Sequence, residues 1–296
     1  MKGMVKILVL GSNGQVGQSL QEIARSFTDF EFVFWTRDDL DLSQLETIHE
    51  TLSIVKPNYI INCAAYTAVD KAEKETELCF DINRKAAKKI AEYASEIKAV
   101  FIHYSSDYVY HNFRTIPLSE SMDTSPKGVY AKSKLQGEQD ILSTGVRGII
   151  LRTSWVYSPF GHNFLKTMLR LAESKTNLTI VADQIGAPTY APDIAGCTMK
   201  MIESIHNNEA TLDQSIILNY AAEGQLSWYD FAKEIFRISQ VDMQLEKTTT
   251  AAYGAPAPRP LWSVLDMTKI KSIFGIAPRY WKDGVKDCIN RLKLEE

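Results

Sequence analysis

Tyr130 and Lys134 are the residues whose types and spacing most directly suggest chemistry. Four positions apart, they would lie on one face of a helix, one above the other. An ammonium group beside a phenol favours the phenolate and lowers the phenol pKa from about 10. A tyrosine in that setting can act as a general acid toward a carbonyl group that is being reduced. The pattern is short, and an ordinary amphipathic helix that carries both residues is the alternative.

A glycine-rich loop lies far upstream and directly follows a mostly apolar run, residues 5–10. Such a run is typical of a strand buried on both faces of a parallel sheet. Gly11, Gly14 and Gly17 come next, followed by a helical pattern to about residue 25. Strand, glycine loop and helix together favour binding of a dinucleotide pyrophosphate, because the backbone can approach the ligand and the helix N-terminus presents free N–H groups. The spacing is GxxGxxG rather than GxGxxG, and a plain strand–turn–helix is the alternative.

The end of the second expected strand, residues 31–35, bears on the choice of dinucleotide. An acidic residue there binds the ribose 2′-hydroxyl group of NAD, whereas an arginine accommodates the 2′-phosphate of NADP. Arg37 favours NADPH, and the adjacent Asp38 and Asp39 keep NADH open. A plain surface charge is the alternative for Arg37.

Strands and helices alternate from residue 5 to about residue 151. This alternation predicts an α/β fold, a Rossmann-type doubly wound parallel sheet with helices on both faces. After residue 152 the alternation is less regular, which indicates a smaller C-terminal lobe. We therefore expect an NAD(P)-binding Rossmann domain over residues 1–152, joined by returning segments, and a mostly substrate-binding lobe over residues 153–296.

Composition limits the classes of function. The 296 residues are 45% hydrophobic and 23% charged, with a formal net charge of −3. These values are typical of a soluble globular protein, and they give no basic field for nucleic acid or an anionic membrane. No apolar run approaches the ~20 residues of a membrane span. The cysteines lack CxxC spacing and the histidines lack metal-ligand spacing, so we expect no metal site, and a reducing cytoplasm is the expected compartment.

Seven motifs follow one another along the chain, namely Gly11–Gly17, Ala64–Glu73, His103–Tyr110, Ser125–Glu138, Leu151–Tyr157, Asp183–Thr189 and Arg259–Asp266. Their sequences and order resemble the extended short-chain dehydrogenase/reductase family. The resemblance covers nearly the whole chain, and it points to members that act on a 4-keto-6-deoxy sugar carried on dTDP. It implies transfer of hydride from NADPH or NADH to C4 of dTDP-4-dehydro-L-rhamnose, which gives dTDP-L-rhamnose.

The resemblance also implies roles for single residues. Tyr130 would protonate the C4 oxygen, and Lys134 would lower the Tyr130 pKa and bind the nicotinamide ribose. Ser106 would hydrogen-bond the substrate carbonyl, and Asp107 would order that corner of the site. The cofactor positions, besides Tyr130 and Lys134, are Gly11, Gly14, Gln15, Val16, Gly17, Arg37, Asp41, Leu42, Ala64, Ala65, Tyr66 and Thr67. The substrate positions, besides Ser106 and Asp107, are Trp155, Thr67, Val69 and Arg259.

Some of these residues have simpler interpretations. Trp155 is alternatively a core aromatic residue at a strand end, and Asp107 is alternatively a turn residue. His103 lies within an expected strand and is predicted to be a packed core residue. Asn83 is predicted to lie on a helix surface.

Some family members carry a glutamate just past the glycine loop that is linked with a metal-bridged dimer. Gln18 and Ser19 occupy that region here. This departure argues against a magnesium-dependent dimer, and a homodimer as such stays open.

Related enzymes of the same fold are the nearest rivals. Nucleotide-sugar 4,6-dehydratases of the family carry Thr-Asp-Glu where this chain has Ser106-Asp107-Tyr108. Tyr108 cannot serve as a carboxylate base, so dehydration is disfavoured. A 4-epimerase, a reductase that gives another 6-deoxy sugar, and a non-catalytic NAD(P)-binding regulatory subunit stay open.

Overall fold

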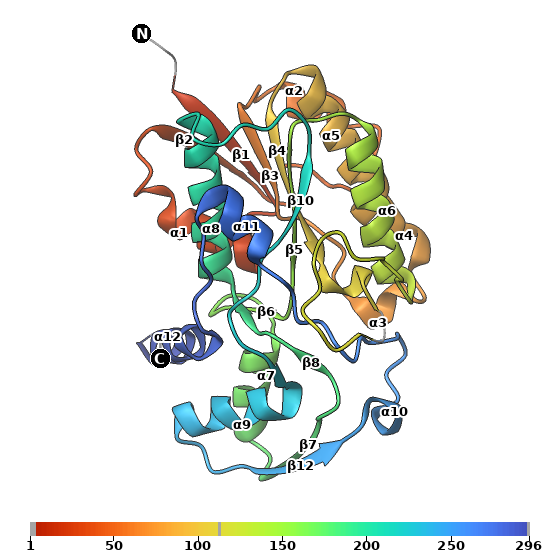
Figure 1. Ribbon diagram of the computed structural model, residues 1–296, viewed down its shortest axis with the longest axis vertical. Coiled ribbons are helices and arrows are strands. Elements are labelled where there is room, and N and C mark those ends of the chain that lie inside the picture. Colours follow the sequence, from red (N-terminus) through yellow and green to blue (C-terminus); the bar gives the residue numbers. More distant parts are fainter. Residues whose placement is uncertain (1–3, 112–113, 295–296) are drawn as a thin grey trace.

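The computed structural model describes residues 4–111 and 114–294 (Figure 1), so the outermost residues of both expected domains lie outside it. Its centre is a six-stranded sheet in the order β10-β5-β4-β3-β1-β2, and each strand pairs in parallel with its neighbour. This topology confirms the predicted doubly wound α/β fold. The strands are β1 (Val5–Leu10), β2 (Phe30–Trp35), β3 (Tyr59–Asn62), β4 (Val100–Ser106), β5 (Gly148–Thr153) and β10 (Ile216–Asn219).

The strand order reverses at β1, which has β2 on one side and β3 on the other. In open α/β sheets, ligands bind in the crevice at the carboxyl ends of the strands where the order reverses. The glycine loop follows β1, and residues 63–65 follow β3. The two segments are joined directly, because the Cys63 amide donates to the Leu10 carbonyl oxygen at 2.9 Å.

Helices cover both faces of the sheet (Figure 1). One apolar core includes Leu20 of α1 and Ile194 of α8 and Ile270 of α11, while the core on the opposite face includes Leu52 of α2 and Ile90 of α5. All five side chains are fully buried, and each apolar side chain of this size contributes about 1.5–3 kcal/mol when it leaves water. The helices are α1 (Gln15–Ala24), α8 (Ala191–His206) and α11 (Thr268–Phe274) on one face, and α2 (Ile48–Ser53), α5 (Ala87–Glu96) and α6 (Val129–Ser143) on the other.

The helical segment that precedes β4 is interrupted. It consists of α4 (Thr76–Phe80), a π-helical turn over Asp81–Ala86, and α5. The prediction that Asn83 lies on a helix surface is wrong, since this residue is only 1% exposed. An inserted residue in a π-turn rotates the following side chains around the axis, which a regular helical pattern does not anticipate.

A second group of elements lies at the end of the sheet where the strands terminate (Figure 1). Phe231, Trp281 and Tyr157 are among the side chains that form its separate apolar core. The elements are α7 (Phe164–Ala172), α9 (Trp228–Ser239) and α12 (Trp281–Leu294), with the strand pairs β7 (Asn177–Val181) and β12 (Gln244–Thr248), β6 (Val156–Tyr157) and β9 (Thr189–Tyr190), and β8 (Ile185–Gly186) and β11 (Leu226–Ser227).

Three elements beyond residue 153, namely β10, α8 and α11, belong to the central sheet and its covering helices. Strand β10 extends the central sheet beside β5, and α8 packs against α1. Short elements complete the chain, namely α3 (Val69–Ala72), a 3-10 turn (Asp107–Val109) and α10 (Thr250–Tyr253). None of the helices within residues 4–111 and 114–294 has the length and apolar character needed to cross a membrane.

Candidate active site

A cavity of about 740 Å³ opens where β1, β3, β4 and β5 end. Its wall combines the glycine loop, the first turn of α6 and the start of the C-terminal group of elements. Most of the predicted site residues meet here, although they come from segments as far apart as residues 11 and 155. Those that line it are Gly11, Gly14, Gln15, Val16, Arg37, Asp41, Leu42, Ala64, Ala65, Thr67, Val69, Ser106, Asp107, Tyr130, Lys134 and Trp155.

Three predicted site residues are not among the residues that line the cavity. Gly17 instead packs closely against the start of the glycine loop. A Cβ at this position would lie 2.5 Å from the Gly11 carbonyl oxygen. The Tyr66 hydroxyl group donates to Glu75 at 2.7 Å, which turns its ring away. Arg259 forms an ion pair with Asp70 at 2.8 Å, next to the lining residue Val69. These three residues support the segments that line the cavity but do not line it themselves.

The glycine loop has the shape of a cradle for a pyrophosphate group. Gly11 has a φ of +70°, and a Cβ at this position would lie 2.6 Å from the Ala64 nitrogen. Only glycine permits both the conformation and the close approach. Gly14 begins α1 without a side chain to cap it, so the first N–H groups of α1 stay available to an anion. The residues at this crevice therefore fit a dinucleotide.

Helix α6 begins at an unusual cap that sets the position of Tyr130. Gly128 precedes the helix with a φ of +79°, and the Val129 amide donates to the Glu73 carboxylate at 2.8 Å. A carboxylate at a helix N-terminus is favoured by the helix dipole and satisfies an otherwise free N–H group. A Cβ at Gly128 would lie 2.7 Å from the same carboxylate, so glycine is needed for this contact.

Tyr130 and Ser106 face each other at the surface of the cavity. Burial raises the pKa of Tyr130 to about 12, while the hydrogen bond with Ser106 acts in the opposite direction. The expected lowering of the Tyr130 pKa by Lys134 is not observed, because desolvation dominates. Tyr130 is therefore a protonated phenol at neutral pH and can donate its proton.

Lys134 is only 2% exposed, and its ammonium nitrogen is directed toward strand β4. Nζ lies 2.6 Å from the Tyr104 carbonyl oxygen and 3.3 Å from His103 Nε2. Burial lowers the pKa of Lys134 to about 8, although the nearby Glu138 carboxylate favours the charged form. The side chain can thus change its charge near physiological pH.

Asp107 lies at the end of β4 with one carboxylate oxygen bound and the other unused. Its Oδ1 accepts from Ser106 Oγ at 3.0 Å, and burial raises the pKa of the carboxyl group to about 6. Among the described residues, Asp107 Oδ2, Ser105 Oγ and Thr153 Oγ1 are buried without a hydrogen-bond partner. All three residues line the cavity. Because unpaired buried polar atoms are costly, their arrangement indicates a polar ligand that completes them.

Trp155 has a strained backbone that fixes its ring at the cavity. Its φ is +47°, a region that costs a bulky residue about 1–3 kcal/mol. The ring stacks on Trp228 with centroids 3.6 Å apart, and a Cβ at Gly186 would lie 2.6 Å from it. Trp155 is therefore both a packed aromatic residue and part of the cavity wall.

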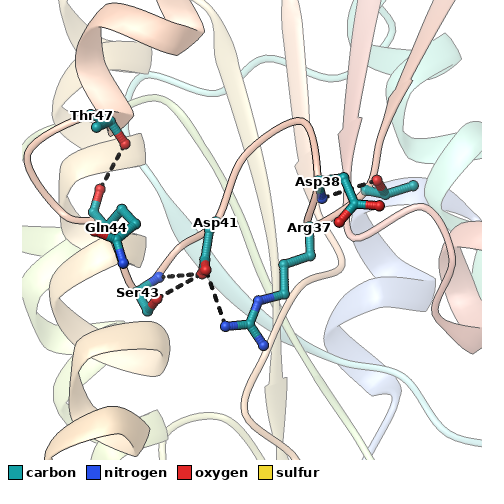
Figure 2. A network of polar contacts seen from close by, with 7 residues as sticks. Arg37, Asp38, Asp41, Ser43, Gln44 and Thr47 are labelled. Atoms are coloured by element: carbon teal, nitrogen blue, oxygen red, sulfur yellow. Dashed lines mark hydrogen bonds and ion pairs between the residues drawn. The ribbon is translucent and has the colours of Figure 1, made fainter.

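Arg37 lies at the opposite end of the cavity, where Figure 2 shows it extending across the turn toward Asp41. The guanidinium nitrogen is 3.1 Å from Asp41 Oδ2, and the Arg37 side chain is 70% exposed. Asp39 instead accepts from the Thr36 amide at 2.8 Å, and neither Asp38 nor Asp39 is among the lining residues. Of the described charges near the end of β2, Arg37 and Asp41 are thus the ones that face the cavity.

Several lining residues were not predicted from the sequence. Tyr108 packs edge-to-face against Tyr130 with ring centroids 5.5 Å apart. Cys63, His162 and Thr153 also contribute to the wall. Thr153 is the last residue of β5, and Tyr108 lies two residues after β4. Their neighbours were predicted site residues, so the position at a strand end was the available signal. His162 lies in a loop with no such signal.

Asn83 and His103 act from behind the wall. The Asn83 side chain accepts from the Tyr66 amide at 2.8 Å and donates to the Tyr66 carbonyl oxygen and to Ser133 Oγ, each at 3.0 Å. It thereby ties the loop after β3 to helix α6. His103 is buried in the core as predicted, at 1% exposure, but it also contacts Lys134.

No metal site is evident near the glycine loop. Gln18 lies in the region where some family members carry a glutamate, and its side chain donates to the Asn13 carbonyl oxygen at 2.8 Å. Within the described part of the chain, His, Cys, Asp and Glu side chains form no group of three that could hold a metal ion.

Comparison with known proteins agrees with this arrangement. A protein of Aggregatibacter actinomycetemcomitans named dTDP-4-dehydrorhamnose reductase is 38% identical over 290 residues, 96% of this chain and 98% of its own. The crystal structure of a dTDP-4-dehydrorhamnose reductase from Clostridium acetobutylicum has a TM-score of 0.91 and 33% identity, covering 98% of this chain and 100% of that one. A Bacillus anthracis dTDP-4-dehydrorhamnose reductase, solved in complex with NADP, has a TM-score of 0.89 and 30% identity, with 99% of both chains covered.

The doubly wound sheet and these relatives identify the chain as an NAD(P)-dependent oxidoreductase of the extended short-chain dehydrogenase/reductase type. Within that class, the chain belongs to the family described as the RmlD substrate binding domain, whose model matches residues 5–294.

Proposed function

We propose that this protein reduces the C4 keto group of dTDP-4-dehydro-L-rhamnose to dTDP-L-rhamnose, with NADPH or NADH as the reductant. The observation that carries the proposal is that Tyr130, Ser106 and the glycine cradle line one cavity. Relatives that align over nearly their whole length bear the name of this activity.

The cofactor would lie along the crevice between β1 and β3. The loop positions Gly11, Gly14, Gln15 and Val16 would bind its pyrophosphate, supported by the packing of Gly17. Ala64, Ala65 and Thr67 would face its nicotinamide half, with Tyr66 holding that loop, and Asp41 and Leu42 would face its adenosine half. When bound, NADPH or NADH supplies the hydride.

Tyr130 would donate its phenolic proton to the C4 oxygen as negative charge develops there. A pKa of about 12 lies below that of an alcohol, so transfer to a forming alkoxide is favourable. Ser106 would orient the carbonyl group by a hydrogen bond. Lys134 would donate to the ribose hydroxyl groups and so fix the reacting carbon relative to Tyr130.

The sugar would occupy the part of the cavity beyond Tyr130. The unpaired Oδ2 of Asp107 would accept a hydrogen bond from a sugar hydroxyl group. Trp155, Thr67 and Val69 would form its walls. Arg259 would act at the rim, where its ion pair with Asp70 fixes the segment that carries Val69.

Arg37 would bind the 2′-phosphate group of NADPH. It is exposed at the adenosine end of the cavity, and its partner Asp41 would serve as the acceptor for a ribose hydroxyl group of NADH (Figure 2). This pairing supports use of both cofactors, with NADPH favoured.

On the scale of the chain, residues 1–152 with the returning α8, β10 and α11 would form the cofactor-binding domain. Residues 153–296 would mostly form the substrate-binding lobe, which begins at Trp155 on the cavity wall. The cytoplasm is the proposed compartment because the pattern of cysteines lacks disulfide spacing. A homodimer would not need a metal ion, since Gln18 is a neutral side chain.

A 4-epimerase and a reductase that forms a different 6-deoxy sugar are the rival functions of the same site. Dehydration is disfavoured further, because Tyr108 lies at the cavity where a carboxylate base would be required. A non-catalytic subunit would have no reason to keep Tyr130 and Ser106 facing each other.

The proposal is tested by following NADPH oxidation with dTDP-4-dehydro-L-rhamnose as substrate. Wild type should consume one NADPH per sugar nucleotide, and Tyr130→Phe should lose about 10²–10⁴-fold in kcat, the usual contribution of a general acid. Tyr93→Phe is the matched control, because Tyr93 is a buried tyrosine that lies outside the cavity lining. Equal rates for wild type and Tyr130→Phe would contradict the assigned mechanism.

A further inference from the structure

His103 lies in the core between Lys134 and Asn62. Its Nε2 is 3.3 Å from Lys134 Nζ, and its Nδ1 is 3.2 Å from Asn62 Nδ2. His103 and Asn62 are each 1% exposed, and they lie opposite each other on the paired strands β4 and β3. Both ring nitrogens are thus engaged by protein groups rather than by solvent.

The orientation of Asn62 is fixed by its other contact. Its Oδ1 accepts from the Ala64 amide at 3.1 Å, in the loop that follows β3. An N–H group requires an acceptor, so the carbonyl oxygen of the side chain must point there. The NH2 group therefore faces His103 Nδ1 and donates to it.

This donation fixes the tautomer of His103. A neutral imidazole carries one proton, and Nδ1 is used as an acceptor, so the proton resides on Nε2. Burial, and secondarily the Lys134 charge, keep the pKa of His103 well below its usual range, so the ring is neutral. The Nε2–H group then points at Lys134 Nζ.

An ammonium group has no lone pair with which to accept this hydrogen bond, whereas a neutral amine has one. A neutral Lys134 can accept from His103 Nε2–H and still donate to the Tyr104 carbonyl oxygen. The other titratable groups that act on Lys134 are Glu138 on its own helix and Cys79 on α4. Glu138 is itself neutralised by a buried ion pair with Arg152 at 2.5 Å.

We propose that His103 is a positioning residue for Lys134: Asn62 fixes its tautomer, and its Nε2–H group donates to the Lys134 amine and stabilises the uncharged form. His103 therefore sets the pH at which Lys134 gains the charge with which it would bind the ribose. This inference deepens the proposed role of Lys134, and its test uses protein without substrate.

The tautomer is measured directly by ¹⁵N NMR of the imidazole in histidine-labelled protein, with the His103 signals assigned from His103→Gln. Above pH 8 we expect a protonated Nε2 and an unprotonated Nδ1. A protonated Nδ1 at that pH would overturn the proposal, because the ring would then present an acceptor to Lys134.

The pKa of Lys134 is measured in protein labelled at lysine Cε, with its signal assigned from Lys134→Met. In His103→Gln the amide can turn its oxygen toward the ammonium group, which favours the charged form, so the Lys134 titration should move up by about one pH unit. His49→Gln is the control, because His49 is exposed, pairs with Glu96 and lies outside the cavity lining.

Asn62→Asp provides a second variant that does not remove the ring. A carboxylate accepts from Nδ1–H, so the ¹⁵N spectrum should switch to the Nδ1–H tautomer and the Lys134 titration should again move up. Unchanged titrations in both variants would contradict the inference. Because these measurements need no turnover, such a result would leave the proposed reductase activity standing.

Discussion

The polar side chains of the cavity are held so that each keeps an atom for a ligand. One carboxylate oxygen of Asp107 accepts a hydrogen bond from Ser106, and the other is unpaired. The hydroxyl groups of Ser105 and Thr153 also have no partner among the described residues. The cost of these orphan groups is about 1–3 kcal/mol each when no ligand is present. A polar sugar would recover it, so we regard these atoms as the recognition surface for the substrate.

The pH dependence of kcat/KM follows from two of these groups. Asp107 should be ionised to accept a sugar hydroxyl group, and Lys134 should be protonated to bind the ribose. Their pKa values of about 6 and about 8 place the rate maximum between these limits, with loss of activity below pH 6 and above pH 8. Asp107→Asn should abolish the acid limb only, and a wild-type profile that is flat from about pH 5 to about pH 9 would contradict the assignment.

Replacing Arg37 tests which cofactor the protein prefers. Arg37→Ala should raise KM for NADPH by about tenfold, since a charge-assisted hydrogen bond at an exposed position is lost, and should leave KM for NADH nearly unchanged. Arg25→Ala, at the other end of α1 and outside the cavity lining, serves as the control for loss of a surface charge. Equal effects on the two cofactors would exclude a contact with the 2′-phosphate.

At the scale of elements, the candidate site residues lie at the carboxyl ends of the strands. Ser106 and Asp107 follow β4, Gly11 follows β1 and Trp155 follows β5. Helix α6 presents Tyr130 from its first turn, and the Arg152–Glu138 ion pair fastens the same helix to β5. The site is thus built on rigid elements, with the loop after β3 tied to α6 through Asn83.

Gly11 offers a matched test of the cradle. Gly11 and Gly145 have nearly equal φ values of +70° and +69°, but a Cβ at Gly145 would have no atom within 4 Å, whereas one at Gly11 would overlap Ala64. Gly145→Ala should cost about 1 kcal/mol from backbone conformation alone. Gly11→Ala should cost more and should also weaken NADP⁺ binding, as measured by thermal unfolding and by titration calorimetry. Equal losses of stability and unchanged binding would refute the crowding argument.

The sequence predicted the elements well because their patterns are local. The apolar runs of β1 and β3 and the alternation of strands and helices are visible without tertiary information. The position of Asn83 was not predictable, since a π-turn changes which face a residue occupies without changing the apolar period. The direction of the Tyr130 pKa was also missed, because it depends on burial by segments that are remote in the chain.

On the scale of the whole molecule, the cavity lies between the carboxyl end of the central sheet and the start of the second group of elements. The glycine loop contacts the second group of elements through Gln15, whose side-chain oxygen accepts from Ser158 at 2.9 Å and from Asn163 at 3.0 Å. Trp155 reaches the cavity from the same group and stacks on Trp228 of α9. The arrangement would bring the proposed hydride donor next to the proposed sugar substrate.

The most direct test of this account is the product of a single reaction. Wild-type protein is incubated with dTDP-4-dehydro-L-rhamnose and NADPH that carries deuterium at the transferable position, and the sugar nucleotide is analysed by NMR. We expect dTDP-L-rhamnose with one deuterium at C4 and an equivalent amount of NADP⁺. A product without deuterium, with NADPH unconsumed, or a product with the other configuration at C4 would contradict the proposed function.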